Sequence, residues 1–178
     1  MKKSILTLFL LPLFIQAQVQ LLPSIGISSL PNDADSVCTI VPRSQGNPWT
    51  AVNLGDTMAD FTLYDISGNA LTLSSVLNTG KRVLMISGSY TCPIFRNQMT
   101  ELKAVAAQFG NDIACFVVYT VEAHPTGSVM PSSGNVNPTN PPYYQPNTYG
   151  ERKAIIQDLL NGVNGPPAGN YIPVSVNV

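Results

Sequence analysis

One of the three cysteines, Cys92, occupies a position that suits nucleophilic chemistry. The residues before it, 82–88, are almost continuously apolar, which is typical of a strand buried on both faces. Pro93, directly after it, suits the first turn of a helix. The free N–H groups and the dipole at a helix start stabilise a thiolate, the form of cysteine that attacks electrophiles. We therefore predict that Cys92 is a reactive nucleophile; the alternative is a buried, inert cysteine.

The single histidine of the chain, His124, follows a second apolar run, residues 113–119. If both runs are parallel strands, Cys92 and His124 leave the sheet at the same edge, where open α/β sheets form their ligand crevice. A histidine beside a cysteine raises the thiolate fraction and delivers a proton to a leaving group. The sequence therefore predicts a Cys–His pair; the alternative is that His124 is an ordinary surface residue.

Three further polar residues accompany this pair. Glu122 precedes the histidine by two positions and could orient its imidazole; the alternative is that the one intervening residue turns it the other way. Ser89 and Thr91 place hydroxyl groups in the turn before the cysteine, where helix capping and turn formation are their alternative roles. The candidate catalytic set is therefore Cys92, His124, Glu122, Thr91 and Ser89.

The other two cysteines lie in different surroundings. Cys115 lies inside the apolar run 113–119 and is expected in the core. Cys38 lies in a proline-rich segment; in an oxidising compartment it could pair with Cys92 or Cys115, or link two copies of the chain as a homodimer. The sequence leaves these pairings open. Because Phe95 stands where a Cys-x-x-Cys motif needs cysteine, a local disulfide cycle at Cys92 is excluded.

Strand and helix patterns alternate through the second half of the chain. Apolar residues at positions 95, 99, 102, 106 and 109 form one stripe of an amphipathic helix. The alternation of strands and helices predicts an α/β fold with a parallel sheet and right-handed crossovers. The expected elements are a hairpin (61–65 and 71–73), strands at 82–88, 113–119 and 172–178, and helices at 93–109 and 151–162.

The chain divides into three segments. Residues 1–17 carry two lysines, an apolar run of about 11 residues and Ala17, which is typical of a cleaved secretory signal peptide and predicts a secreted or periplasmic protein. The alternative is an uncleaved membrane anchor, although the run is shorter than the about 20 residues that span a bilayer. Residues 18–53 contain four prolines and no sustained periodicity, so we expect an irregular leader. The remaining 54–178 form the domain, which ends on a strand and is therefore expected to be C-terminally incomplete.

Composition excludes several classes of protein. Only 11% of the 178 residues are charged, against about 25% in a typical protein. With 9 basic and 10 acidic residues there is no surplus to neutralise phosphates, so no nucleic acid is expected as a partner. The sequence holds no glycine-rich phosphate loop and no metal-ligand spacing, so we expect no cofactor and no metal.

Two stretches resemble known families. The sequence GDTMADFTL at 55–63, with the hairpin and the cysteine at a helix start, resembles the redoxin branch of the thioredoxin superfamily. GSYTCPIF at 88–95, followed by VYTVEAH at 118–124, resembles the iodothyronine deiodinase family, in which a GSxT(Cys or selenocysteine)P turn precedes a strand ending in Tyr-x-x-Glu-Ala-His. This second resemblance covers about residues 82–178. It implies a thioredoxin-like fold with an N-terminal β-hairpin extension, here lacking the last strands and helix.

The resemblance also implies roles for the candidate residues. Cys92 matches the selenocysteine position, whose side chain attacks the halogen of an iodinated phenol. Thr91 and Ser89 match hydroxyl groups of the family's proton network, and Glu122 and His124 match its acidic and histidine members. The implied reaction is reductive dehalogenation of a small molecule such as a halogenated phenol, with an external thiol as reductant.

This sequence also departs from the family pattern. Sulfur replaces selenium at Cys92 and is the weaker nucleophile for attack on halogen. Tyr90 stands where the animal enzymes usually carry cysteine, and a further family histidine is replaced near Gln145. We therefore expect an exported thiol oxidoreductase of deiodinase-like type. The alternatives are a peroxiredoxin-type peroxidase in which Cys92 attacks peroxide and Cys38 resolves, and a non-catalytic thioredoxin-fold binding module of a larger secreted protein.

Overall fold

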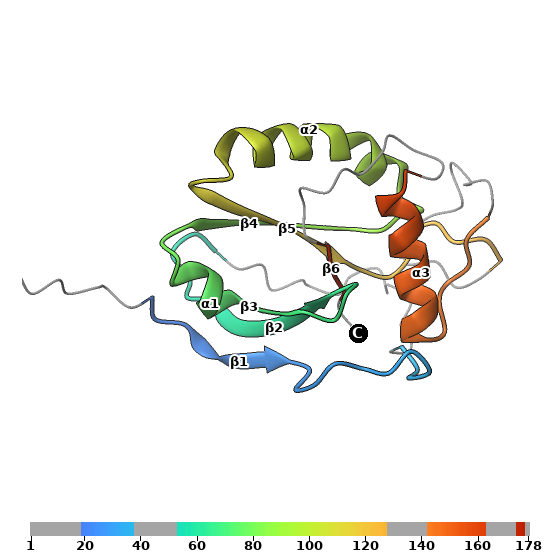
Figure 1. Ribbon diagram of the computed structural model, residues 1–178, viewed down its shortest axis with the longest axis horizontal. Coiled ribbons are helices and arrows are strands. Elements are labelled where there is room, and N and C mark those ends of the chain that lie inside the picture. The colour runs from blue at the N-terminus through green and yellow to red at the C-terminus, as the bar shows by residue number, and fades with distance from the viewer. Residues whose placement is uncertain (1–18, 38–52, 128–141, 163–173, 177–178) are drawn as a thin grey trace, which may run out of the picture.

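The computed structural model describes residues 19–37, 53–127, 142–162 and 174–176. The elements are listed in chain order, as labelled in Figure 1: β1 (Leu22–Gly26), β2 (Ala59–Asp65), β3 (Ala70–Thr72), α1 (Leu73–Leu77), β4 (Arg82–Gly88), α2 (Pro93–Phe109), β5 (Ile113–Tyr119), α3 (Tyr149–Leu160) and β6 (Val174–Val176). The predicted signal peptide lies outside the described residues.

The six strands form one mixed sheet in the order β1-β2-β6-β5-β4, with β3 paired to β2. Strands β4, β5 and β6 run parallel, and β2 runs antiparallel to β3 and β6. Strands β4 and β5 are in register along their full length, so their last residues, Gly88 and Tyr119, are direct partners. The segments that follow these two strands therefore begin side by side at one edge of the sheet.

Helix α2 connects β4 to β5 and lies over them in Figure 1. Pro93 is its first residue, where the missing N–H costs nothing because that group has no partner within the helix. The predicted apolar stripe packs inward at Phe95 and Met99, which are buried. Its last member, Phe109, is instead 41% exposed, because it lies at the end of the helix.

One buried cluster joins the two helices to the sheet. It contains ten residues from α2, β5, α3 and the segments beside them: Tyr90, Phe95, Met99, Val117, Tyr119, Tyr143, Tyr149, Ile155, Ile156 and Leu159. Four of these ten are tyrosines, so this core brings hydroxyl groups as well as apolar surface under the sheet edge that carries Cys92.

Helix α3 begins two residues before the predicted start at Glu151. Thr148 is its N-cap and its side chain accepts a hydrogen bond from the Glu151 N–H at 3.2 Å. The Glu151 carboxylate in turn accepts from the Asn147 N–H at 2.7 Å. The first contact satisfies an N–H group that the first turn leaves without a helical partner, and the second ties the residue before the N-cap to the helix.

Two elements differ from the sequence-based expectation. The segment 18–53 is not irregular throughout, because it contributes β1, which pairs in parallel with β2 through contacts such as the Leu22 N–H to the Met58 carbonyl at 2.9 Å. All five β1 residues are exposed, so no alternation of polar and apolar residues marks this strand in the sequence. Leu73, expected at the end of the hairpin, instead begins α1 and is buried.

The predicted α/β class is confirmed. Strand β4, helix α2 and strand β5 form a parallel strand–helix–strand unit with a cysteine directly before the helix, and an antiparallel β2–β3 hairpin precedes it. This arrangement fits a thioredoxin-like fold. The described part of the predicted last strand is limited to β6.

Candidate functional site

Cys92 is the N-cap residue of α2, directly after β4 and a short turn. Its backbone is extended, with φ −82° and ψ 110°, and its side chain is half-buried. The Cys92 N–H donates to the Ser89 carbonyl at 3.1 Å, and the Cys92 carbonyl accepts from the Arg96 N–H at 3.1 Å. These two bonds hold the thiol at the start of a 17-residue helix, where the positive end of the dipole favours an anion.

Glu122 holds this turn from the neighbouring strand end. Its carboxylate accepts from the Thr91 N–H at 2.9 Å and from the Thr91 hydroxyl at 2.7 Å. The Tyr119 hydroxyl donates to the other carboxylate oxygen. Glu122 is fully buried. The two carboxylate oxygens of Glu122 are thus bonded to Thr91 and Tyr119, and the orientation of the His124 imidazole by Glu122 stays a prediction.

The two predicted hydroxyl groups bind the segment after β5. Ser89 Oγ accepts from the Ala123 N–H at 3.0 Å, and Thr91 Oγ1 accepts from the His124 N–H at 3.0 Å. The N-cap of α2 makes no side-chain hydrogen bond, so neither hydroxyl caps this helix. Four of the five candidate residues are thus joined beside Cys92. His124 is half-buried and takes part through its main chain, so an approach of its imidazole to the thiol stays a prediction.

Two residues absent from the predicted set complete the network. The Tyr119 hydroxyl accepts from the Tyr90 N–H at 3.0 Å while it donates to Glu122, so it links both strand ends. Gln145 accepts from the Glu122 N–H at 3.1 Å and donates to the Glu122 carbonyl at 2.6 Å. Tyr119 lies within the motif that resembles deiodinases, which could have marked it. Gln145 was named in the sequence only as the place where a further family histidine is replaced, which could have marked it.

Burial controls the protonation of the two central groups. Desolvation raises the pKa of the Glu122 carboxyl, and the hydrogen bonds from Tyr119 and Thr91 and the positive charge of Arg152 oppose that shift. Desolvation and the adjacent Glu122 charge raise the pKa of the Tyr119 hydroxyl well above its ordinary value. Glu122 therefore retains a proton at a higher pH than an exposed carboxyl does, directly behind the cysteine turn.

The structure describes two of the three cysteines, Cys92 and Cys115, and the prediction that Cys115 lies in the core is confirmed. Cys115 is buried on β5, and desolvation raises the pKa of its thiol, which makes it a core residue and a poor nucleophile. Cys92 is half-buried, and neither of these two thiols forms a disulfide. Cys38, the proposed pairing partner, lies outside the described residues.

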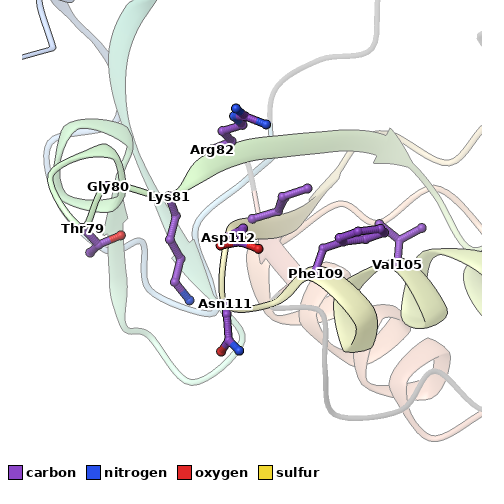
Figure 2. A pocket seen from close by; sticks show the side chains of 9 residues that line it. Thr79, Gly80, Lys81, Arg82, Val105, Phe109, Asn111 and Asp112 are labelled. Atoms are coloured by element: carbon purple, nitrogen blue, oxygen red, sulfur yellow. The ribbon is translucent and has the colours of Figure 1, made fainter.

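A cavity lies at the end of the sheet opposite to Cys92. This cavity of about 620 Å³ is lined by nine residues that include Lys81, Arg82, Phe109 and Asp112. Figure 2 shows Phe109 and Val105 on α2 at one side and Lys81 at the start of β4 at the other. These residues lie where β4 begins and α2 ends, whereas Cys92 follows the end of β4. The cavity therefore contains none of the predicted site residues.

The described residues include neither a candidate metal site nor a candidate membrane-spanning helix. No group of three or more histidine, cysteine, aspartate or glutamate residues is placed to hold a metal ion. Within the same ranges, no helix has both the length and the apolar character needed to cross a bilayer.

Comparison with known proteins gives a distant structural likeness. No protein-family model matches the chain, and no curated protein matches it. Among solved structures, it is similar to the exposed lipoprotein thioredoxin of Streptococcus pneumoniae, with a TM-score of 0.40 and 19% sequence identity. The match covers 67% of this chain and 66% of that protein, so this chain spans slightly less than two thirds of that protein's length.

Proposed function

We propose that this protein is an exported thiol oxidoreductase of deiodinase-like type, with Cys92 as its nucleophile. The observation that carries the proposal is the setting of Cys92: a half-buried thiol at the N-cap of a 17-residue helix. The neighbouring residue, Thr91, donates two hydrogen bonds to the buried Glu122 carboxyl, and desolvation raises the pKa of that carboxyl. A thiol at a helix N-terminus with a proton-holding group behind it suits attack followed by proton delivery.

The proposed reaction is reductive dehalogenation of a small iodinated phenol. The Cys92 thiolate attacks the iodine, the carbon–iodine bond breaks, and the ring carbon takes a proton through His124, which leaves a sulfenyl iodide on Cys92. One external thiol displaces iodide to form a mixed disulfide. A second external thiol releases Cys92 and leaves as the disulfide of the reductant. The sum is one aryl iodide and two thiols giving arene, disulfide and hydrogen iodide.

The reactivity of the thiol is measured first. The rate of iodoacetamide labelling at Cys92 is followed against pH, site by site, by mass spectrometry. We expect Cys92 to react faster in the folded protein than in the same chain unfolded in urea, and to react more slowly in folded His124→Ala than in the folded wild type. Equal rates in the folded and unfolded wild type, unchanged by His124→Ala, would contradict the catalytic role and favour a non-catalytic binding module.

The substrate class is tested with matched cysteine variants. Iodide release from iodophenols in the presence of a dithiol is expected from the wild-type protein and from Cys115→Ser, and not from Cys92→Ser. Peroxide consumption in the same variants distinguishes the peroxiredoxin-type alternative. Dithiol-dependent loss of peroxide without any iodide release would replace the dehalogenase assignment and leave Cys92 as a peroxide-reactive thiol.

Export rests on the N-terminal sequence, which lies outside the described residues. We propose that cleavage follows Ala17, because a short basic start, an apolar run and a small residue occur there in that order. Expression of the whole chain in a bacterial host, followed by fractionation and N-terminal sequencing, tests this. Mature protein beginning at Gln18 in the periplasm is the expected result, and an intact N-terminus in the cytoplasm would contradict it.

A further inference from the structure

We propose that Arg96 and the first turn of α2 form a subsite for a carboxylate on the molecule that reacts at Cys92. This inference deepens the proposed function, because it rests on Cys92 as the reacting residue and adds the charge of the substrate. It depends on four observations: Arg96 is buried, its contacts are with neutral groups, it lies near the start of α2, and Glu122 is already held by hydrogen bonds from other residues.

Arg96 is a buried cation. Its side chain is 8% exposed, although it lies only four residues after the N-cap of a helix that begins at the sheet edge. Its Nη1 donates to the Tyr90 carbonyl at 2.6 Å, and the guanidinium carbon lies 5.8 Å from the centroid of the Tyr90 ring. Both contacts are with neutral groups. A buried charge is costly unless an opposite charge is close.

No carboxylate pairs with Arg96 in the part of the chain that the structure describes. The ion pair found there joins Lys153 and Asp33, which is a separate surface contact. The nearby buried carboxyl, Glu122, accepts hydrogen bonds from Thr91 and Tyr119. The ion pair of the described residues does not include Glu122 or Arg96, so Arg96 is not the salt-bridge partner of this carboxyl.

The position of Arg96 on α2 directs its charge to the cysteine. Residues four apart on a helix are neighbours on its surface, so Arg96 lies on the same face as Cys92. Side chains on a helix lean toward its N-terminus, and the bond to the Tyr90 carbonyl shows that the guanidinium reaches the turn before Cys92. The other two guanidinium nitrogens of Arg96, Nε and Nη2, are not among the fully buried atoms that lack a hydrogen-bond partner, so they retain some contact with solvent.

These features favour a carboxylate as the missing partner. The positive end of α2 and the Arg96 guanidinium act on the same small region, so both attract an anion there. A planar guanidinium matches a carboxylate through two parallel hydrogen bonds. The turn also carries an aromatic ring, Tyr90, beneath the cation. A small aromatic or aliphatic electrophile that bears a carboxylate therefore fits this region better than its neutral counterpart.

The test compares two alkylating reagents that differ mainly in charge. Iodoacetate and iodoacetamide both form a sulfur–carbon bond with Cys92 and release iodide, but only iodoacetate carries a carboxylate. The ratio of their rate constants at Cys92 is measured in the folded protein and in the same chain unfolded in urea. A charged hydrogen bond contributes roughly 1.5–3 kcal/mol, so we expect the folded ratio to exceed the unfolded ratio on the order of tenfold. An equal ratio in both states would overturn the inference.

Variants assign the effect to Arg96. Arg96→Gln should return the ratio to its unfolded value, and Arg96→Lys, which keeps the charge without the planar fork, should keep part of it. Arg82→Gln is the matched control, because it removes one positive charge from an exposed residue at the other end of β4 and should leave the ratio unchanged. A ratio that survives in Arg96→Gln, or falls equally in Arg82→Gln, would overturn the inference.

The same data separate this inference from the proposed function. The absolute rate with neutral iodoacetamide reports whether Cys92 is activated, and the ratio reports whether an anion is recognised. A fast neutral reaction with an unfolded-like ratio would reject the subsite and leave the nucleophile in place. If Arg96→Gln does not fold, the wild-type ratio against salt decides, because a rise from about 0.01 M to about 1 M shortens the Debye length roughly tenfold and should lower the ratio.

Discussion

The Glu122 carboxylate accepts hydrogen bonds from both the backbone N–H and the hydroxyl of Thr91, the residue directly before Cys92. One buried acid at the end of β5 therefore fixes the turn at the end of β4. Because Cys92 follows this turn without a break, the position of its thiol depends on a carboxyl that does not contact it. Stability and reactivity are thus expected to change together at this edge of the sheet.

The stability of the protein should depend on the protonation of Glu122. Burial raises the pKa of this carboxyl above its ordinary value of 4.5, so between the unfolded and the folded pKa the folded state holds a proton that the unfolded chain has lost. This stabilising contribution is fully present below the unfolded pKa and is lost as the pH rises through the folded pKa. Urea unfolding across this pH range should show a decline for the wild type that is absent in Glu122→Gln.

The control for this experiment is Glu101→Gln, which removes an exposed carboxylate of α2. It should keep the pH dependence of the wild type. A decline that persists in Glu122→Gln would assign the titration to another group and contradict the role given to this carboxyl.

The Thr91 hydroxyl should contribute measurably to folding. Thr91→Val keeps the shape of the side chain but removes the bond to Glu122 and the acceptor for the His124 N–H. Buried polar groups left without partners cost about 1–3 kcal/mol, so we expect a loss of that size in the free energy of unfolding. Chemical denaturation measures it. Thr91→Ser, which keeps a hydroxyl and loses only the methyl group, should lose less. An unchanged free energy of unfolding in Thr91→Val would contradict a contribution from the hydroxyl.

Gly88 should be needed for the docking of α2. A Cβ at this position would overlap the ring of Phe95, which packs against the end of β4. Overpacking in a core typically costs about 1–3 kcal/mol, so Gly88→Ala should destabilise the protein by that amount and shift α2 and the Cys92 N-cap with it. The measurement is the free energy of unfolding together with the labelling rate at Cys92.

A second change tests the cause of that loss. Phe95→Leu provides space beside residue 88, so Gly88→Ala should cost less in the Phe95→Leu background than in the wild type. Costs that simply add in the double variant would mean that the ring is not the obstacle.

Cys115 should be protected from alkylation until the chain unfolds. It is buried, and desolvation raises the pKa of its thiol. Mass spectrometry of singly labelled protein should therefore find iodoacetamide at Cys92 well before it appears at Cys115 near neutral pH. In urea the two sites should react at similar rates. Early labelling of Cys115 in the folded protein would contradict its place in the core.

The sequence alone was sufficient to locate the junction of strand, cysteine and helix. A continuous apolar run, a proline and an apolar stripe are local signals, so β4, Cys92 and α2 could be predicted from neighbouring residues. The same reasoning placed β5 and most of α3. It missed β1, because a strand exposed at every residue leaves no periodic pattern.

The partners of the site residues were decided only by the tertiary structure. Spacing along the chain suggested His124, two positions away, as the partner of Glu122. The parallel register of β4 and β5 brings Glu122 to Thr91, 31 residues earlier, a contact that spacing does not indicate. Gln145 reaches the main chain of Glu122 across 23 residues. Such contacts arise when strand ends and loops pack together, and because burial removes water, a buried carboxylate accepts the donors that packing places beside it.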